Sequence, residues 1–169
     1  MRENKAAGIE AEEAGAPAPA PRPVWGGPGA VLGRLAGRWE IDREIAPGGS
    51  LEGLAVFEPE RDGGLDYREQ GELRLSSGFT AAAARRYLYR ARPAGFTVLF
   101  AERPPRLFHE VVLAADRRGR LRGRARHLCG ADLYLTSYLF LPDGRFVIRH
   151  RVRGPRKAYR MTTWYRRRP

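Results

Sequence analysis

The sequence predicts an all-β protein, an antiparallel meander of eight to ten strands that closes into a barrel. Two observations carry this prediction. From residue 38 onward, ten short strand-like runs follow one another at close spacing, and turn signals rich in Gly, Pro, Asp and Ser separate them. Almost no helical pattern accompanies them, so no helical layer can cover the strands. Hairpin-connected strands without such a layer must close on themselves or stack as a sandwich, and the hairpins favour the closed barrel.

The predicted elements follow one another in a simple order. A short helical turn over 30–37 leads into the first strand. The gaps between strands hold turn signals such as Pro47-Gly48-Gly49 and Asp62-Gly63-Gly64. The alanine-rich segment 81–86 leaves a helix open as an alternative to the start of the fourth strand, because alanine favours helices. The ten predicted strands cover 38–45, 51–58, 65–75, 85–91, 96–101, 107–114, 121–129, 133–141, 145–153 and 158–167.

Residues 1–30 differ in composition from the rest. They are rich in Ala, Pro, Gly and Glu and have almost no periodic apolar residues. Such a segment cannot bury enough surface to offset its ordering entropy, so we expect a disordered tail at 1–30 and one barrel domain at 31–169. Glu10, Glu12 and Glu13 interrupt the place where a secretory signal needs an apolar stretch. The sequence also has no apolar run of about 18 residues that would span a membrane as a helix.

The chain is strongly basic. It carries a net charge of +12, and residues 31–169 hold 28 Lys and Arg against 15 Asp and Glu. This excess favours an anionic partner such as nucleic acid, membrane headgroups or an acidic small molecule. Alternatively, the arginines reflect the composition of a GC-rich genome, since Lys5 and Lys157 are the only lysines. The single cysteine, Cys129, excludes an internal disulfide and favours a reducing, cytoplasmic setting.

Alternation in the second half of the chain predicts which face of the sheet is interior. Every second residue from 120 to 126 is an arginine, and 145–153 contains a similar row. Arginine rows typically face solvent, so the opposite face, which includes His127, is predicted to be interior. A row of leucines would then lie outside. Either another element or a second subunit covers them, or the turn register is shifted by one residue. These leucines are Leu133, Leu135, Leu139 and Leu141.

The most informative candidate site is the segment 127–134. A two-residue turn that begins with Gly130 would make a tight hairpin of the mirror-image type. Cross-strand partners and alternate residues share a face of a sheet, so four reactive or titratable side chains are expected to point the same way. They are His127, Cys129, Asp132 and Tyr134.

Four roles are open for this cluster. His, Cys and Asp on one face could hold zinc with an open fourth position. Cys129 beside His127 could form a nucleophilic pair, with Asp132 orienting the ring. In a structural role, Asp132 would cap the turn, Cys129 would pack as a small apolar residue, and His127 would hydrogen-bond Tyr134. In a noncovalent pocket, His127 and Tyr134 would bind the polar end of a ligand.

A second group lies on the third, fourth and sixth predicted strands. Tyr67 and Glu69 share one face, and Arg85, Tyr87 and Tyr89 share another. If both faces are interior, a buried pair of Arg85 with Glu69 would line the cavity among tyrosine hydroxyls. Buried charges must be paired, so this is either a structural network or a clamp for a carboxylate or phosphate. The group also includes Arg86 and His109.

A third group is the segment 149–165, where arginines alternate with Tyr159, Trp164 and Tyr165. Basic residues interleaved with aromatics can neutralise and stack on single-stranded nucleic acid. The alternative is a solvated arginine face with core aromatics behind it, and no nucleic-acid-binding motif accompanies the charge. Lys157 and Tyr159 follow a turn at Gly154-Pro155 and are expected at the barrel mouth.

Two resemblances support the barrel. Gly37-Arg38-Trp39 resembles the Gly-x-Trp signature of lipocalin-like (calycin) barrels, which implies that Trp39 closes the barrel floor beneath Arg166 or Arg167. Residues 31–167 also resemble a bacterial family of unknown function, which has no established activity and therefore supports the fold and the choice of site. The pieces that carry this second resemblance include Gly37-Arg38-Trp39, Tyr67-Arg68-Glu69-x-Gly71, Arg86-Tyr87, Phe108-His109, the 127–134 segment and Arg153-Gly154-Pro155-x-Lys157-x-Tyr159.

These observations predict that the barrel binds a small, partly apolar and anionic ligand inside. Two other functions stay open: a small hydrolase or isomerase that uses His127 with Asp132, Cys129 or Glu69, and a nucleic-acid-binding module built on the C-terminal strands. A homodimer through the leucine row is compatible with each, and no cofactor is indicated. The predicted ligand-binding residues are His127, Cys129, Asp132, Tyr134, Arg85, Tyr87, Glu69, His109, Tyr138, Lys157 and Tyr159.

Overall fold

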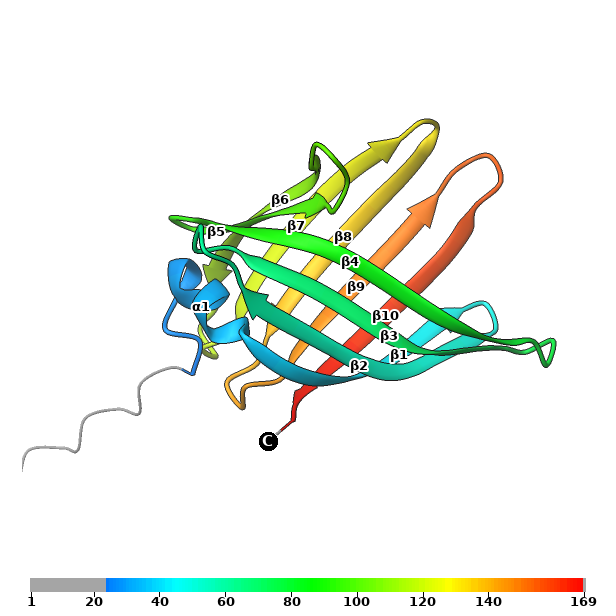
Figure 1. The fold of residues 1–169 in the computed structure, drawn as a ribbon, viewed down its shortest axis with the longest axis horizontal. Helices are drawn as coiled ribbons and strands as arrows, with labels where there is room; N and C mark the ends of the chain where they lie inside the picture. The colour runs from blue at the N-terminus through cyan, green and yellow to red at the C-terminus, as the bar shows by residue number, and fades with distance from the viewer. Residues whose placement is uncertain (1–23, 169) are drawn as a thin grey trace, which may run out of the picture.

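The strand-like runs pair with one another in chain order, and the sheet that they form closes on itself (Figure 1). The computed structural model describes residues 24–168. Each strand is antiparallel to its chain neighbours, and the first strand also pairs with the last, from Trp39 opposite Arg167 to Ala46 opposite Arg160. Every described strand therefore has a partner on both sides, which removes the exposed sheet edges that favour aggregation.

The elements have regular bounds. A 3-10 turn η1 (Pro28–Ala30) and a short helix α1 (Val31–Leu35) precede the barrel. The strands are β1 (Gly37–Ala46), β2 (Gly49–Pro59), β3 (Leu65–Leu75), β4 (Thr80–Arg92), β5 (Gly95–Phe100), β6 (Arg106–Ala115), β7 (Leu121–Cys129), β8 (Asp132–Phe140), β9 (Phe146–Arg153) and β10 (Ala158–Arg167).

This arrangement confirms the predicted all-β class, the closed antiparallel barrel and the helical turn at its start. The largest difference lies in β4, which begins at Thr80 and takes in the alanine-rich segment. Ala81 and Ala83 pair with Leu73 and Gly71 of β3. Pairing with a neighbouring strand therefore outweighs the weak intrinsic preference of alanine for a helix.

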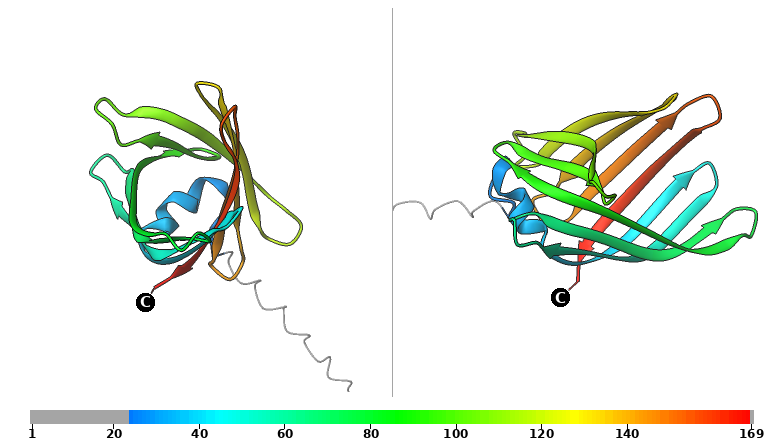
Figure 2. Two further views of the ribbon diagram at one scale, coloured as in Figure 1. Left: turned by 90° about the vertical axis from the view of Figure 1, so that its right-hand side faces the viewer. Right: turned by 45° about the horizontal axis from the view of Figure 1, so that its top comes forward.

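One end of the barrel, its floor, is closed by α1 and by Trp39. Figure 2 (left) looks along the ring of strands and shows α1 at the far end. The buried indole of Trp39 donates its N–H to the carbonyl of Leu35 at 2.8 Å. The guanidinium of Arg167 lies 4.3 Å from the centre of the Trp39 ring and donates to the carbonyl of Ala36 at 2.9 Å. The floor that the Gly-x-Trp resemblance implies is thus present, with Arg167 over the ring.

Packing against the floor begins before residue 31, where the sequence suggests that the domain starts. Trp25 is buried, its ring stacks 6.2 Å from that of Trp39, and its N–H donates to the carbonyl of Leu141 at 2.7 Å. The packed domain therefore begins at least as early as Trp25, whose buried indole contributes a large apolar area. The rest of the expected tail, 1–23, lies outside the described residues.

The opposite end is the mouth, which is surrounded by the β1–β2, β3–β4, β5–β6, β7–β8 and β9–β10 connections (Figure 1).

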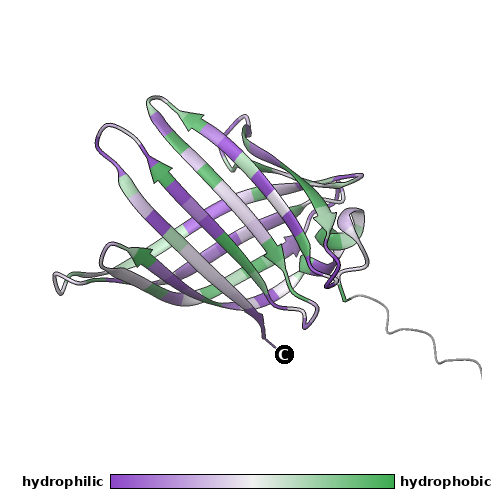
Figure 3. Ribbon diagram, turned by 180° about the vertical axis from the view of Figure 1, so that it is seen from behind, coloured by the Kyte–Doolittle hydropathy of each residue, from purple (hydrophilic) through white to green (hydrophobic). Residues whose placement is uncertain are grey.

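The inward and outward faces predicted for β7, β8 and β9 are correct. Leu135 pairs with Arg126 of β7 and with Arg151 of β9, so the leucine row of β8 does lie outside, and a shifted register is excluded. Leu135 is 40% exposed. Figure 3 shows hydrophilic and hydrophobic segments alternating along these strands.

Among residues 24–168 no helix is long and apolar enough to cross a membrane.

Candidate functional site

Two segments that stand out in the sequence meet at the mouth of the barrel. In the β7–β8 hairpin, His127 pairs with Tyr134, and Cys129 pairs with Asp132. Gly130 begins the two-residue turn with a φ of 59°, the left-handed conformation that a mirror-image turn requires there. The predicted hairpin and its register are therefore confirmed.

Asp132 connects this hairpin to the turn between β9 and β10. Its carboxylate lies 2.6 Å from the Nζ atom of Lys157, and the hydrogen bond between them raises the pKa of Lys157. Gly154 permits the contact, because a Cβ at that position would collide with the Asp132 carboxylate. The two motifs thus join in one ion pair at the mouth, beside the half-buried Tyr159.

The remaining members of the hairpin cluster lack the contacts of a catalytic group. Within the described residues, no hydrogen bond joins His127 to Cys129, Asp132 or Tyr134, and the buried Nε2 atom of His127 has no partner. Cys129 is exposed. Asp132 does not orient the His127 ring, because its carboxylate is paired with Lys157. The hydrogen bonds that would activate Cys129 as a nucleophile are therefore not formed in this structure. No three His, Cys, Asp or Glu side chains of residues 24–168 are placed to hold a metal ion, so the zinc alternative gains no support.

The centre of the barrel holds a buried ion pair. Arg43 donates to both carboxylate oxygens of Glu69, at 2.8 and 2.7 Å, and its Nε donates to the hydroxyl of Thr163 at 2.7 Å. The hydroxyl of Tyr67 also bonds Glu69 and lies 3.1 Å from the hydroxyl of Tyr165. Arg43 and Glu69 are each 5% exposed. A bidentate geometry with further donors is what allows two charges to persist away from water.

Burial and pairing act in opposite directions on these groups. Burial by itself would lower the pKa of Arg43 and raise that of Glu69, but their hydrogen bonds and opposite charges outweigh it. The pKa of Arg43 is therefore raised and that of Glu69 is lowered, so both remain charged. Burial also raises the pKa of Tyr67 well above its usual range, which keeps its hydroxyl protonated.

The arginine of this pair is not the one that the sequence suggests. Arg85 stands opposite Glu69 in the β3–β4 register, yet its Nε atom lies 3.9 Å from the carboxylate and its side chain is 42% exposed. Arg43 reaches Glu69 from β1 instead. The register places Arg43 opposite Leu51 of β2 and Glu69 opposite Ala55, so the path between the two side chains crosses β2 beside the small residues Gly53 and Ala55.

Arg86 lies outside the barrel, because it is the strand neighbour of the inward-pointing Arg85. Its guanidinium donates twice to the carboxylate of Asp66, at 2.9 Å in both contacts, on the outer face of the barrel. Arg85 and Arg86 are therefore adjacent arginines of one strand on opposite faces of the sheet.

Three histidines lie in the lumen. Burial, together with the neighbouring His127, lowers the pKa of His109 to about 4. Burial, followed by the effect of His109, lowers the pKa of His150 to about 3. Both rings are therefore neutral at neutral pH. His109 Nε2 lies 2.8 Å from the hydroxyl of Tyr138, and the other ring nitrogen, Nδ1, is buried without a partner.

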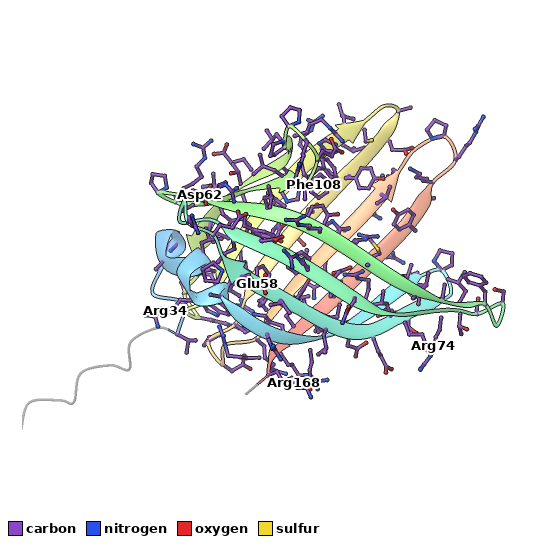
Figure 4. The ribbon with its side chains drawn as sticks, in the orientation of Figure 1. Arg34, Glu58, Asp62, Arg74, Phe108 and Arg168 are labelled. Atoms are coloured by element: carbon purple, nitrogen blue, oxygen red, sulfur yellow. The ribbon has the colours of Figure 1, made fainter. Side chains whose placement is uncertain are left out.

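The space left between these side chains is small. A cavity of about 20 Å³ lies at the centre of the barrel, which is room for about one water molecule. Phe108, labelled in Figure 4, lines it and stacks 5.6 Å from Tyr87. The other lining residues are Arg43, Tyr67, Glu69, Arg85, Tyr87, Tyr89, Val98, Tyr138, Ile148, His150 and Tyr165.

The predicted site residues divide by depth. Glu69, Arg85, Tyr87 and Tyr138 line the central cavity, and His109 bonds Tyr138 beside it. The hairpin cluster, Lys157 and Tyr159 lie nearer the mouth. Sequence reasoning missed Arg43, Thr163, Phe108 and His150 as lining or network residues. The sequence could have indicated Arg43, because Trp39 and Arg43 are an even number of residues apart on the first strand and therefore point to the same, inner face.

The third sequence group divides between two faces. Tyr159 and Tyr165 point inward, and Tyr165 belongs to the central network. Trp164 lies outside and is 38% exposed. Of the two arrangements that the sequence leaves open, the structure matches the arginine face with core aromatics behind it, apart from Trp164, since alternate residues of one strand occupy opposite faces.

These features define a class: small closed β-barrels with a polar, charged lumen under an aromatic mouth. The chain belongs to the family described as a family of unknown function (DUF6314), whose model matches residues 35–167. No curated protein matches the chain.

Two solved structures match most of the chain at low similarity. One is described as EF1p2_mFAP2b bound to DFHBI, with a TM-score of 0.41, 16% identity, and coverage of 83% of this chain and 98% of that one. Another is described as a de novo designed fluorescence-activating β-barrel, with a TM-score of 0.42, 13% identity, and coverage of 81% and 96%. These values are too low to transfer a ligand from those barrels to this chain.

Proposed function

We propose that the barrel binds a small, partly apolar anion through its mouth, with Arg85 as the residue that holds the negative group. One observation carries the proposal. Arg85 lines the central cavity, but Glu69, the carboxylate nearest to it at 3.9 Å, already accepts two closer hydrogen bonds from Arg43. The guanidinium of Arg85 therefore has donors to spare for a ligand.

The charges of the lumen favour an anion. Arg43 and Glu69 neutralise each other, as do Lys157 and Asp132 at the mouth. The lowered pKa values of His109 and His150 keep both rings uncharged at neutral pH. Arg85 is then the lining charge of residues 24–168 whose nearest carboxylate, Glu69 at 3.9 Å, is already neutralised by Arg43. A carboxylate, sulfonate or phosphate beside it would complete a bidentate pair.

The neighbouring side chains favour an apolar or aromatic body attached to that anion. Phe108 stacks 5.6 Å from Tyr87 and lies 4.8 Å from Phe100, measured between ring centres. His127 and Tyr134 extend this aromatic group toward the mouth. Aromatic surfaces of this kind contribute most of the contact area in small-molecule sites.

The cavity sets a limit on how such a ligand binds. Its volume of about 20 Å³ accommodates a water-sized group and no more. The anionic group of the ligand would therefore lie at Arg85 and its apolar body nearer the mouth, where aromatic side chains such as Phe108 must move aside. Such side-chain rearrangement on binding is common.

The test uses the aromatic sulfonate 1-anilinonaphthalene-8-sulfonate as the probe and its fluorescence as the readout. A charge-assisted hydrogen bond contributes about 1.5–3 kcal/mol, so Arg85→Gln is expected to weaken binding by at least about tenfold. Arg86→Gln removes the same charge from the adjacent outward position and is expected to leave the affinity unchanged. The uncharged analogue N-phenyl-1-naphthylamine is expected to bind both variants alike. Equal sulfonate binding by the two variants would refute the role of Arg85.

A further inference from the structure

The outer surface of β7, β9 and β10 carries six arginines that have no carboxylate partner. None of them lies within 4.0 Å of an Asp or Glu oxygen among residues 24–168. We call this surface the basic face; its arginines are Arg124, Arg126, Arg149, Arg151, Arg153 and Arg160.

The opposite side of the barrel shows that this lack of partners is local. On β3 and β4, Arg68, Arg74, Arg86 and Arg90 each lie within 3 Å of a carboxylate. The outward positions of β7 to β10 contain no Asp or Glu at all. Outward carboxylates begin on the two flanking strands: Glu44 of β1 pairs with Thr162 at the border of the face, and Glu110 of β6 lies 3.7 Å from Arg92. The positive potential of the basic face is therefore not neutralised by the described chain.

The register brings the arginines into rows across the strands. Leu135 of β8 has Arg126 on one side and Arg151 on the other, and Arg151 in turn pairs with Arg160. Three strand spacings make this row about 14 Å wide. A second row places Ser137 between Arg124 and Arg149. A shallow hollow of about 500 Å³ lies between the two rows.

We infer that the basic face binds the phosphate backbone of double-stranded nucleic acid without reading its sequence. Arginine forms bidentate hydrogen bonds with phosphate, and the face supplies six guanidinium groups without competing carboxylates. Single-strand binding by base stacking is disfavoured, because Tyr159 and Tyr165 point into the barrel and Trp164 alone remains outside.

Two other occupants fit the face less well. A second copy of the chain would bring its own arginines against these, and like charges repel. A bilayer would require a continuous group of protruding apolar side chains, whereas Leu135 lines the hollow, and the exposed Leu128 and Trp164 lie on opposite sides of the two arginine rows. The positive charge therefore favours a polyanion that meets the surface without insertion.

The experiment measures binding of a fluorescein-labelled 20-base-pair DNA duplex by anisotropy between 50 and 200 mM KCl, with an RNA duplex of the same length in parallel. Six phosphate contacts predict a slope of log K against log salt of about −5, and an affinity loss of about a thousandfold over this range. The triple variant Arg126→Gln, Arg149→Gln, Arg151→Gln is expected to make the slope less negative by about 2.7. Binding of either duplex with this behaviour supports the inference.

The matched control removes three arginines that lie in turns away from the face, Arg61→Gln, Arg117→Gln and Arg118→Gln. It has the same net charge as the triple variant and is expected to keep the wild-type slope. The triple variant Arg126→Lys, Arg149→Lys, Arg151→Lys is expected to keep most of the slope, which separates the effect of lost charge from that of misfolding. Equal losses in the two Gln variants, or binding to phosphatidylserine vesicles without binding to either duplex, would overturn the inference. Arg85→Gln is expected to have no effect, so this outcome is independent of the proposed lumen site.

Discussion

The buried pair at the centre of the barrel allows a quantitative test. Glu69→Gln keeps the size of the side chain but removes its charge, and leaves the Arg43 guanidinium, 5% exposed, without a carboxylate. Removing one partner of a buried pair costs about 3–5 kcal/mol, a large part of the roughly 5–15 kcal/mol that stabilises a typical domain. We expect urea unfolding, followed by tryptophan fluorescence, to show a loss of this size.

The same strand offers a matched control. Glu72 pairs with Arg74 at 2.6 Å on the outer face, where its side chain is 54% exposed, so Glu72→Gln is expected to cost less than about 1 kcal/mol. The double variant Arg43→Met, Glu69→Met removes both charges and is expected to be more stable than Glu69→Gln, because no buried charge is left unpaired. Similar costs for Glu69→Gln and Glu72→Gln would show that the central pair is not the buried network described here.

Three further predictions concern the floor, the mouth and the lumen. Trp25→Ala is expected to cost about 3–5 kcal/mol in urea unfolding, which a position outside the packed domain would not show. Gly154→Ala collides with the Asp132 carboxylate and is expected to lower stability by about 1–3 kcal/mol, whereas Gly33→Ala in helix α1, with open space around it, is expected to raise stability by up to about 1 kcal/mol. Because burial lowers the pKa of His109 to about 4 and that of His150 to about 3, the unfolded chain takes up protons that the folded barrel does not. The contribution of the two neutral histidines to stability is therefore complete above about pH 6.5 and falls as the pH drops toward 3, by up to about 3 kcal/mol for each histidine at pH 4. Replacing both histidines with Gln is expected to make stability less dependent on pH in this range. A pH dependence that the double variant leaves unchanged would contradict this assignment.

The sequence predicts the barrel well because its information is local. Turn residues mark every connection, and alternation gives the inward face of each strand, so the register from His127 to Tyr134 follows from a single glycine-first turn. The exception, the start of β4, is a place where local preference and pairing disagree. The alanines at 81–84 do not indicate in the sequence that they pair with β3.

The site is predicted less completely because its contacts join distant parts of the chain. The expectation of a buried arginine–glutamate pair is correct in type, but Arg43 reaches Glu69 across two small residues of β2, and strand periodicity does not contain that geometry. The ion pair of Asp132 with Lys157 likewise depends on the absence of a side chain at Gly154. Periodicity gives the face of a residue; how far a long side chain reaches across the lumen depends on the volumes of its neighbours.

Anion binding by Arg85 inside the barrel is tested most directly by NMR observation of the arginine Nε–H groups during titration with 1-anilinonaphthalene-8-sulfonate. We expect the Nε–H signal of Arg85 to shift as the probe is added and to reach a plateau, while the signal of Arg86, which is bonded to Asp66, stays unchanged. A titration in which only arginines of the basic face respond, with Arg85 unchanged, would contradict binding inside the barrel.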